Sequence, residues 1–122
     1  MKKIYSKVLL VVALDDYAEQ IGARARDIAA GCDAELSILH VVEYVPVEPM
    51  GETLLPTVQI EEELVQRAKQ RLAELAKRLG VESARREVAA GNIKAEIVRA
   101  AQEQKADLIV LAAVSAAGRR SW

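Results

Sequence analysis

The chain contains few residues whose types and spacing fit catalysis. His40 is the single histidine, and Ser37 precedes it by three positions within an apolar stretch that is typical of a strand. Because side chains alternate between the two faces of a strand, Ser37 and His40 point to opposite faces and cannot share a proton. A lone imidazole is also too few ligands for zinc. We therefore expect His40 to be a hydrogen-bonded residue of the core.

Carboxylates and glycines offer no stronger candidates. The acidic groups Asp15-Asp16 and Glu61-Glu62-Glu63 precede or open apolar stretches with helical spacing. Capping and the helix dipole account for acidic residues there. The sequence has no phosphate-binding Gly-x-x-x-x-Gly-Lys-Ser/Thr, no dinucleotide-binding Gly-x-Gly-x-x-Gly and no nucleophile motif Gly-x-Ser-x-Gly. We predict no catalytic residues, no metal site and no enzymatic activity.

Length and charge restrict the partners. The 122 residues suit a single domain over residues 1–122, and 17 basic against 18 acidic side chains give a net charge of −1. Such a balance gives no field that would attract nucleic acid or an acidic membrane. The apolar run from Val8 to Leu14 is too short for a membrane span, and Cys32 has no second cysteine for an internal disulfide. These features predict a cytoplasmic protein with neither nucleic acid nor membrane as partner.

Apolar runs and helical periods alternate along the chain. Four short apolar runs predict strands at Lys7 to Leu14, Ala34 to Val42, Glu82 to Ala89 and Ala106 to Leu111. Between them, apolar residues recur every three or four positions and predict helices. The first helix is expected to start at Asp15 or Asp16 and to bury Ala18, Ile21, Ala25, Ile28, Ala29 and Cys32. The second is expected over Val58 to Leu79 with a stripe of Leu64, Ala68, Leu72, Leu75, Ala76 and Leu79. The third is expected from Asn92 to about Lys105, with Ile93, Ile97, Val98 and Ala101 on one side.

Strands joined by helices predict an α/β fold with an open parallel sheet. With right-handed crossovers, the Rossmann-like strand order 3-2-1-4 places the first two helices on one face and the third alone on the other. The fourth strand then forms an apolar edge that lacks a covering helix. We expect a second copy of the chain, a swapped segment or the tail from Val114 to Trp122 to cover it.

Several stretches together resemble a known family. These are Val8-Leu9-Leu10-Val11-Val12 in the first strand, Leu36-Ser37-Ile38-Leu39-His40-Val41-Val42 in the second, Gly91 after the third, and Ala106-Asp107-Leu108-Ile109-Val110 in the fourth. In this order and spacing, over residues 4 to 111, the chain resembles the universal stress protein family. The resemblance implies a sheet of order 3-2-1-4-5, a dimer and, in one branch, ATP bound between the first and fourth strands.

Measured against that family, the chain lacks several features of the ATP binders. Ala13 replaces an aspartate, Asp15 falls on a serine, and Ala112 and Ser115 replace two glycines that let backbone amides approach phosphate. The last glycine loop, the fourth helix and the fifth strand would fall beyond Trp122, so we expect a domain incomplete at its C-terminus. The resemblance leaves a residual adenine-nucleotide site of Val11, Val12, Ala13, Val41, Leu111, Ala112 and Ser115, although ordinary sheet core also explains its apolar members.

The function predicted from the sequence is a universal stress protein-like stress-response module. It is expected to be non-enzymatic, to self-associate through its fourth strand, and to bind ATP weakly or not at all, without a required cofactor. The alternative keeps ATP or AMP as a ligand, with a partner chain completing the phosphate site.

Overall fold

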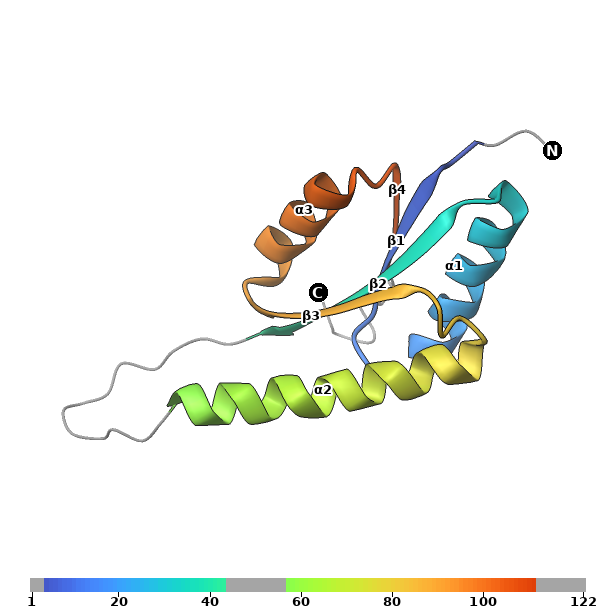
Figure 1. Ribbon diagram of the computed structural model, residues 1–122. Coiled ribbons are helices and arrows are strands. Elements are labelled where there is room, and N and C mark those ends of the chain that lie inside the picture. Colours follow the sequence, from blue (N-terminus) through green and yellow to red (C-terminus); the bar gives the residue numbers. More distant parts are fainter. Residues whose placement is uncertain (1–3, 44–56, 112–122) are drawn as a thin grey trace, which may run out of the picture.

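The computed structural model describes residues 4–43 and 57–111, which form a parallel sheet with helices on both faces (Figure 1). Each of the first three strands is followed by a helix that returns the chain to the same end of the sheet, as parallel pairing requires. In chain order the elements are β1 (Lys7–Val11), α1 (Ala18–Cys32), β2 (Glu35–Glu43), α2 (Thr57–Leu79), β3 (Arg85–Gly91), α3 (Ile93–Gln104) and β4 (Leu108–Leu111).

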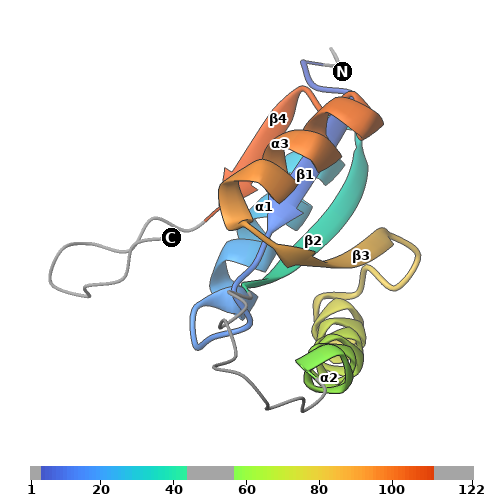
Figure 2. The ribbon, with the colours of Figure 1, turned by 90° about the vertical axis from the view of Figure 1, so that its left-hand side faces the viewer.

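The sheet has the order β3-β2-β1-β4, which confirms the predicted α/β fold and strand order. All three pairings are parallel, and Val11 lies between Leu39 of β2 and Leu111 of β4. Helices α1 and α2 lie on one face and α3 lies on the other, with β3 and β4 at the two outer sides (Figure 2). This is the arrangement that right-handed crossovers produce for this order.

Each face of the sheet has its own apolar cluster. The cluster under α1 and α2 contains Leu10, Val12, Ala18, Ala25, Ile38, Leu72, Leu75, Ala76 and Leu79. The cluster under α3 is smaller and contains Leu9, Val11, Leu39, Val41 and Ala100. Because neighbouring residues of β1 and β2 alternate between the clusters, apolar residues are needed on both faces, which explains the unbroken apolar run over residues 8–11 of β1 and the predominance of apolar residues in β2.

The helix ends depart from the prediction at one point. Helix α1 begins at Ala18, with Tyr17 at its N-cap and no side-chain cap, and not at Asp15 or Asp16. Asp15 instead accepts a hydrogen bond of 2.9 Å from the Tyr17 amide, because its carboxylate is used in the turn before the helix. Helix α3 does have a side-chain cap, since Asn92 accepts a hydrogen bond of 2.9 Å from the Ala95 amide.

Two further predictions need correction. The third strand begins at Arg85 and not at Glu82, because Val81 to Ala84 form a turn closed by the Ala84 amide and the Val81 carbonyl. Ile28 and Leu64, both expected in the core, are 36% and 40% exposed. The predicted buried stripe therefore included one residue too many in α1 and one in α2, since only the centre of an amphipathic face meets the sheet.

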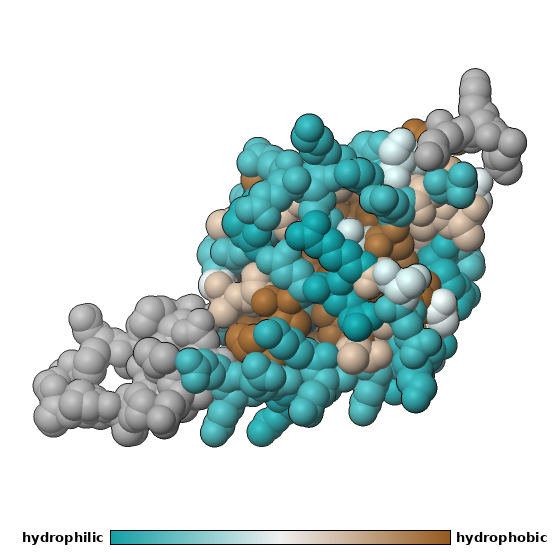
Figure 3. Space-filling view, viewed as in Figure 1, coloured by the Kyte–Doolittle hydropathy of each residue, from teal (hydrophilic) through white to brown (hydrophobic). Residues whose placement is uncertain are grey.

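The surface seen in Figure 3 is mostly polar along α2 and α3, with apolar side chains gathered between these helices where the sheet edge at β3 faces the viewer. Within residues 4–43 and 57–111, no helix is long and apolar enough to cross a membrane.

Candidate functional site

The carboxyl ends of β1, β2 and β4 bring several of the predicted nucleotide-site residues together. Val11 and Leu111 are register partners, and continuing the β1–β2 register by two residues puts Ala13 level with Val41. Val11 and Val41 are buried in the cluster under α3, and Ala13 is half-buried. Ala112 and Ser115 lie outside the described residues.

Val12 does not share this surface. Its side chain belongs to the cluster under α1 and α2, on the other face of the sheet from Val11 and Val41. Alternation along β1 imposes this separation. An adenine ring lying against Val11, Val41 and Leu111 would therefore contact Val12 through its backbone only.

His40 fixes the end of β1 from the α1 and α2 side. Its Nδ1 lies 2.8 Å from the Val12 carbonyl oxygen, so Nδ1 carries the proton and donates it. Burial lowers the pKa of His40; the hydrogen bond to Val12 raises it, and the positive charge of Arg71 adds a smaller lowering. The ring is thus neutral at pH 7, and its contact is that of the structural histidine that the sequence predicted.

Arg71 of α2 holds the next turn of the chain. One of its terminal nitrogens, Nη2, donates a hydrogen bond of 2.8 Å to the carbonyl oxygen of Leu14, which has a positive φ of 58°. A leucine rarely adopts this conformation, and outside contacts must maintain it. His40 and Arg71 together fix the path of the loop from β1 to α1 at the edge of the candidate site.

An apolar groove lies beside the same strand ends, on the face that α3 covers incompletely. Its volume is about 670 Å³. Val98, Ile109 and Leu111 remain 49%, 37% and 38% exposed. The residues that line it are Glu43, Asn92, Ile93, Lys94, Ile97, Val98, Ile109 and Leu111. Its apolar lining can take an apolar surface, and nothing in it activates a nucleophile.

The groove could have been found from the sequence. Ile97 and Val98 are adjacent in α3. Neighbouring residues of a helix point about 100° apart, so both cannot face the centre of the same sheet surface. The sequence prediction placed both in one stripe, whereas the structure gives Ile97 a half-buried position and exposes Val98.

Ion pairs among the described residues join elements of the fold. Arg99 of α3 contacts Glu87 at 2.8 Å, Glu96 at 2.8 Å and Glu103 at 2.9 Å, which ties the helix to β3. No three His, Cys, Asp or Glu side chains within residues 4–43 and 57–111 are placed to bind a metal ion together. The geometry at the strand ends therefore supports binding or association.

Comparison with known proteins agrees with this fold. The profile of the universal stress protein family matches residues 4–121. The chain is similar to universal stress protein A homolog 1 of Coxiella burnetii, with 31% identity over 108 residues that cover 88% of this chain and 75% of the relative. Homolog 2 of the same organism is 30% identical over 108 residues, covering 88% of this chain and 74% of that protein.

Solved structures show the same architecture. The universal stress protein UspA from Lactobacillus plantarum superposes with a TM-score of 0.73 at 24% identity, covering 91% of this chain and 79% of that one. A universal stress protein solved in complex with cAMP superposes with a TM-score of 0.53 at 27% identity, covering 86% of this chain and 70% of that one.

Proposed function

We propose that this chain, which belongs to the universal stress protein family, acts as a non-catalytic stress-response module that associates with a second copy of itself. In this proposal it works in the cytoplasm and binds ATP weakly or not at all. The observation that carries the proposal is the apolar groove beside β4, where the exposed residues Val98, Ile109 and Leu111 lie together.

The edge of β4 supports association with a like chain. Within the described residues, β4 pairs with β1 alone, so its outer backbone groups face no other strand. Such an edge pairs readily with a further strand. A two-fold contact between two β4 edges would run antiparallel and join the sheets of both copies into one.

The exposed side chains strengthen that argument. Ile109 and Leu111 point to the face of α3 while Val110 packs into the opposite cluster. In a two-fold pairing both copies present Ile109 and Leu111 on the same face of the joined sheet, next to Val98. Full burial of one such side chain stabilises by about 1.5 to 3 kcal/mol, so a few of them give a measurable dimer.

Weak nucleotide binding follows from the residues around the strand ends. Ala112 and Ser115 stand where the ATP-binding members of the family have glycines, and a Cβ there hinders close approach of backbone amides to phosphate. Of the apolar residues expected around adenine, Val11 and Val41 are fully buried in the core and Val12 faces the opposite side. Among the described residues of that set, Ala13 is half-buried and Leu111 is exposed.

A second candidate function is adenine-nucleotide binding. It is favoured by the relative of 27% identity that was solved with cAMP. In this alternative, a partner chain supplies the donors to phosphate that the chain lacks at Ala112 and Ser115, and adenine lies against Leu111 at the end of β4.

Sedimentation equilibrium tests the first proposal, and calorimetry separates it from the second. We expect a dimer at micromolar protein concentration, and ATP, AMP and cAMP to bind no tighter than millimolar. A monomer at these concentrations would overturn self-association. Micromolar affinity for any of the three nucleotides would establish the alternative in its place.

A further inference from the structure

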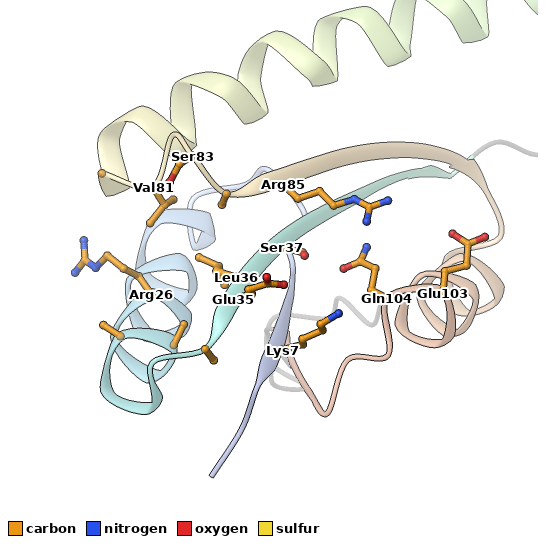
Figure 4. A pocket seen from close by; sticks show the side chains of 15 residues that line it. Lys7, Arg26, Glu35, Leu36, Ser37, Val81, Ser83, Arg85, Glu103 and Gln104 are labelled. Atoms are coloured by element: carbon orange, nitrogen blue, oxygen red, sulfur yellow. The ribbon is translucent and has the colours of Figure 1, made fainter. Parts of the chain in front are cut away.

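The amino ends of the strands carry a second hollow, at the opposite end of the sheet from Val11, Val41 and Leu111. Its volume is about 630 Å³, within the range of small-molecule sites. It lies over the starts of β1, β2 and β3, between the C-terminal ends of α1 and α3, and the turn after α2 completes its lining, which is largely polar (Figure 4). Neither self-association through β4 nor nucleotide binding uses this hollow.

Gln104 is the first indication of a ligand. It is 9% exposed, the one buried polar residue among those the structure describes, and its side chain points into the hollow (Figure 4). None of the side-chain hydrogen bonds within residues 4–43 and 57–111 involves its amide, which remains accessible from the hollow. No polar side-chain atom of the described residues is both buried and without a partner, so the Gln104 amide reaches the surface of the hollow, where water or a ligand can pair with it.

Four more polar side chains converge on the same space. Lys7, Glu35, Ser37 and Arg85 extend from the starts of three neighbouring strands toward Gln104 (Figure 4). The sheet register sets this convergence, because Lys7 pairs with Glu35 and Ser37 pairs with Arg85. Alternation puts all four on the α3 face, level with the end of that helix.

Within residues 4–43 and 57–111, the charged side chains of this group form no ion pair with one another or with other residues. Neither Lys7 nor Arg85 has a carboxylate partner among the described residues, whereas Arg99 on the same face has three. Arg26 and Glu103 also line the hollow, but they are paired with Asp27 and Arg99 respectively. Among the unpaired groups, the two cations exceed the carboxylate of Glu35 by one positive charge. Ser37 and the Gln104 amide add neutral donors and acceptors.

We propose that this hollow binds a small polyhydroxylated anion, such as a sugar acid or a sugar phosphate. Arg85 and Lys7 would hold the carboxylate or phosphate group, since a guanidinium donates two parallel hydrogen bonds to either. Glu35, Ser37 and Gln104 would bond the hydroxyl groups, which both donate and accept. The proposal is independent of the proposed dimer, because the two surfaces lie at different places on the molecule.

Amide NMR on the full chain tests the proposal, with gluconate and glucose 6-phosphate as anionic probes and sorbitol as the neutral control. We expect the amide signals of Ser37, Arg85 and Gln104 to shift and saturate at millimolar concentration of at least one anion, and to stay unmoved with sorbitol. Which anion saturates identifies carboxylate or phosphate as the recognised group. The signals of Val11 and Val41, at the far end of the strands, should stay in place.

Variants locate the binding group. Arg85→Gln should raise the dissociation constant of the anion about tenfold, which is the effect of losing one charge-assisted contact at a partly exposed site. Gln104→Glu keeps the side-chain shape but cancels the surplus positive charge, and it should raise the dissociation constant of the anion by a similar factor. The matched control is Arg86→Gln, because Arg86 neighbours Arg85 but donates to the Glu82 carbonyl on the other face of β3.

Three results would overturn the proposal. The first is the absence of saturable shifts with both anions, and the second is equal shifts with sorbitol. The third is a loss of affinity with Arg86→Gln as large as that with Arg85→Gln, which would indicate a general effect of surface charge.

Discussion

The two faces of the sheet use alternate residues of the same strands, yet helices cover one face fully and the other only in part. The face under α1 and α2 is closed: Leu10, Val12 and Ile38 lie under two helices and are almost wholly buried. The face under α3 is closed over Leu9 and Leu39 but leaves Ile109 and Leu111 exposed at β4.

The difference follows from the number of covering helices and not from the composition of the strands. One helix is about 10 Å across and covers about two strands spaced 4.8 Å apart. Helix α3 lies over β2 and the adjoining parts of β1 and β3, and leaves the face open at β4. The closed face should determine folding, and the open face should determine association. Mutations on the two faces can separate these roles.

The largest effect is expected on the closed face. Leu72→Ala removes a side chain that is 1% exposed in α2, and the resulting cavity should lower the free energy of unfolding by about 2 to 5 kcal/mol. Urea denaturation measures the loss. The control is Leu64→Ala on the same helix, where the leucine is 40% exposed and the expected loss stays below about 1 kcal/mol. Equal losses at the two positions would contradict the assignment of the core.

On the open face, association should change and folding should not. Ile109→Lys places a charge on the groove and should raise the dissociation constant of the dimer at least about tenfold, with the free energy of unfolding of the monomer unchanged within about 0.5 kcal/mol. Ile28→Lys is the matched control, because Ile28 is almost equally exposed but lies on α1. Sedimentation equilibrium distinguishes the two, and equal weakening by both variants would reject the groove as the contact.

A smaller effect is expected from the ion pairs that hold α3 on the open face. Arg99→Met removes three contacts with carboxylates, and because the Arg99 side chain is 35% exposed, we expect a loss of about 0.5 to 1 kcal/mol. The loss should disappear in 1 M salt, where the screening length is about 3 Å. Arg24→Met on α1, measured in parallel by urea denaturation, should cost nothing. A loss at Arg99 that persists in high salt would indicate packing of its stem instead.

The smallest effect concerns the polar residue within the closed face. Because burial lowers the pKa of His40, the unfolded chain binds a proton at a higher pH than the folded chain. Stability should therefore fall as the pH is lowered from 6.5, the ordinary value, through the lower pKa of the folded state. His40→Gln should flatten the dependence of unfolding on pH between 7 and 5.5. An unchanged slope in this variant would show that other groups cause it.

The sequence predicted the fold well because its signals were long-range and redundant. Apolar runs in β1 and β2, helical periods such as that of Leu72, Leu75 and Leu79, and the handedness of crossovers all lead to the order β3-β2-β1-β4. Local details were less accurate. Asp15 is of a residue type that often caps helices, but it closes the preceding turn, since an aspartate can use the same oxygen in either role.

The candidate sites depended on information that periodicity does not carry. The same apolar residue types, such as Val11 and Val41, occur at strand ends whether those ends form core or a ligand surface. The sequence reasoning identified the bare edge at β4, because counting helices per face requires only topology. It missed the hollow around Gln104, because Lys7, Ser37, Arg85 and Gln104 are far apart in the chain and meet only through the register of three strands.

Native mass spectrometry of the purified protein tests the central claim most directly, because one spectrum reports both the number of chains and any retained small molecule. The account predicts a dimer whose mass is that of two chains, with no adenine nucleotide added. A monomer at micromolar concentration would contradict it. A complex that carries the added mass of ATP or AMP for each chain would contradict the weak binding proposed here and support the nucleotide-binding alternative.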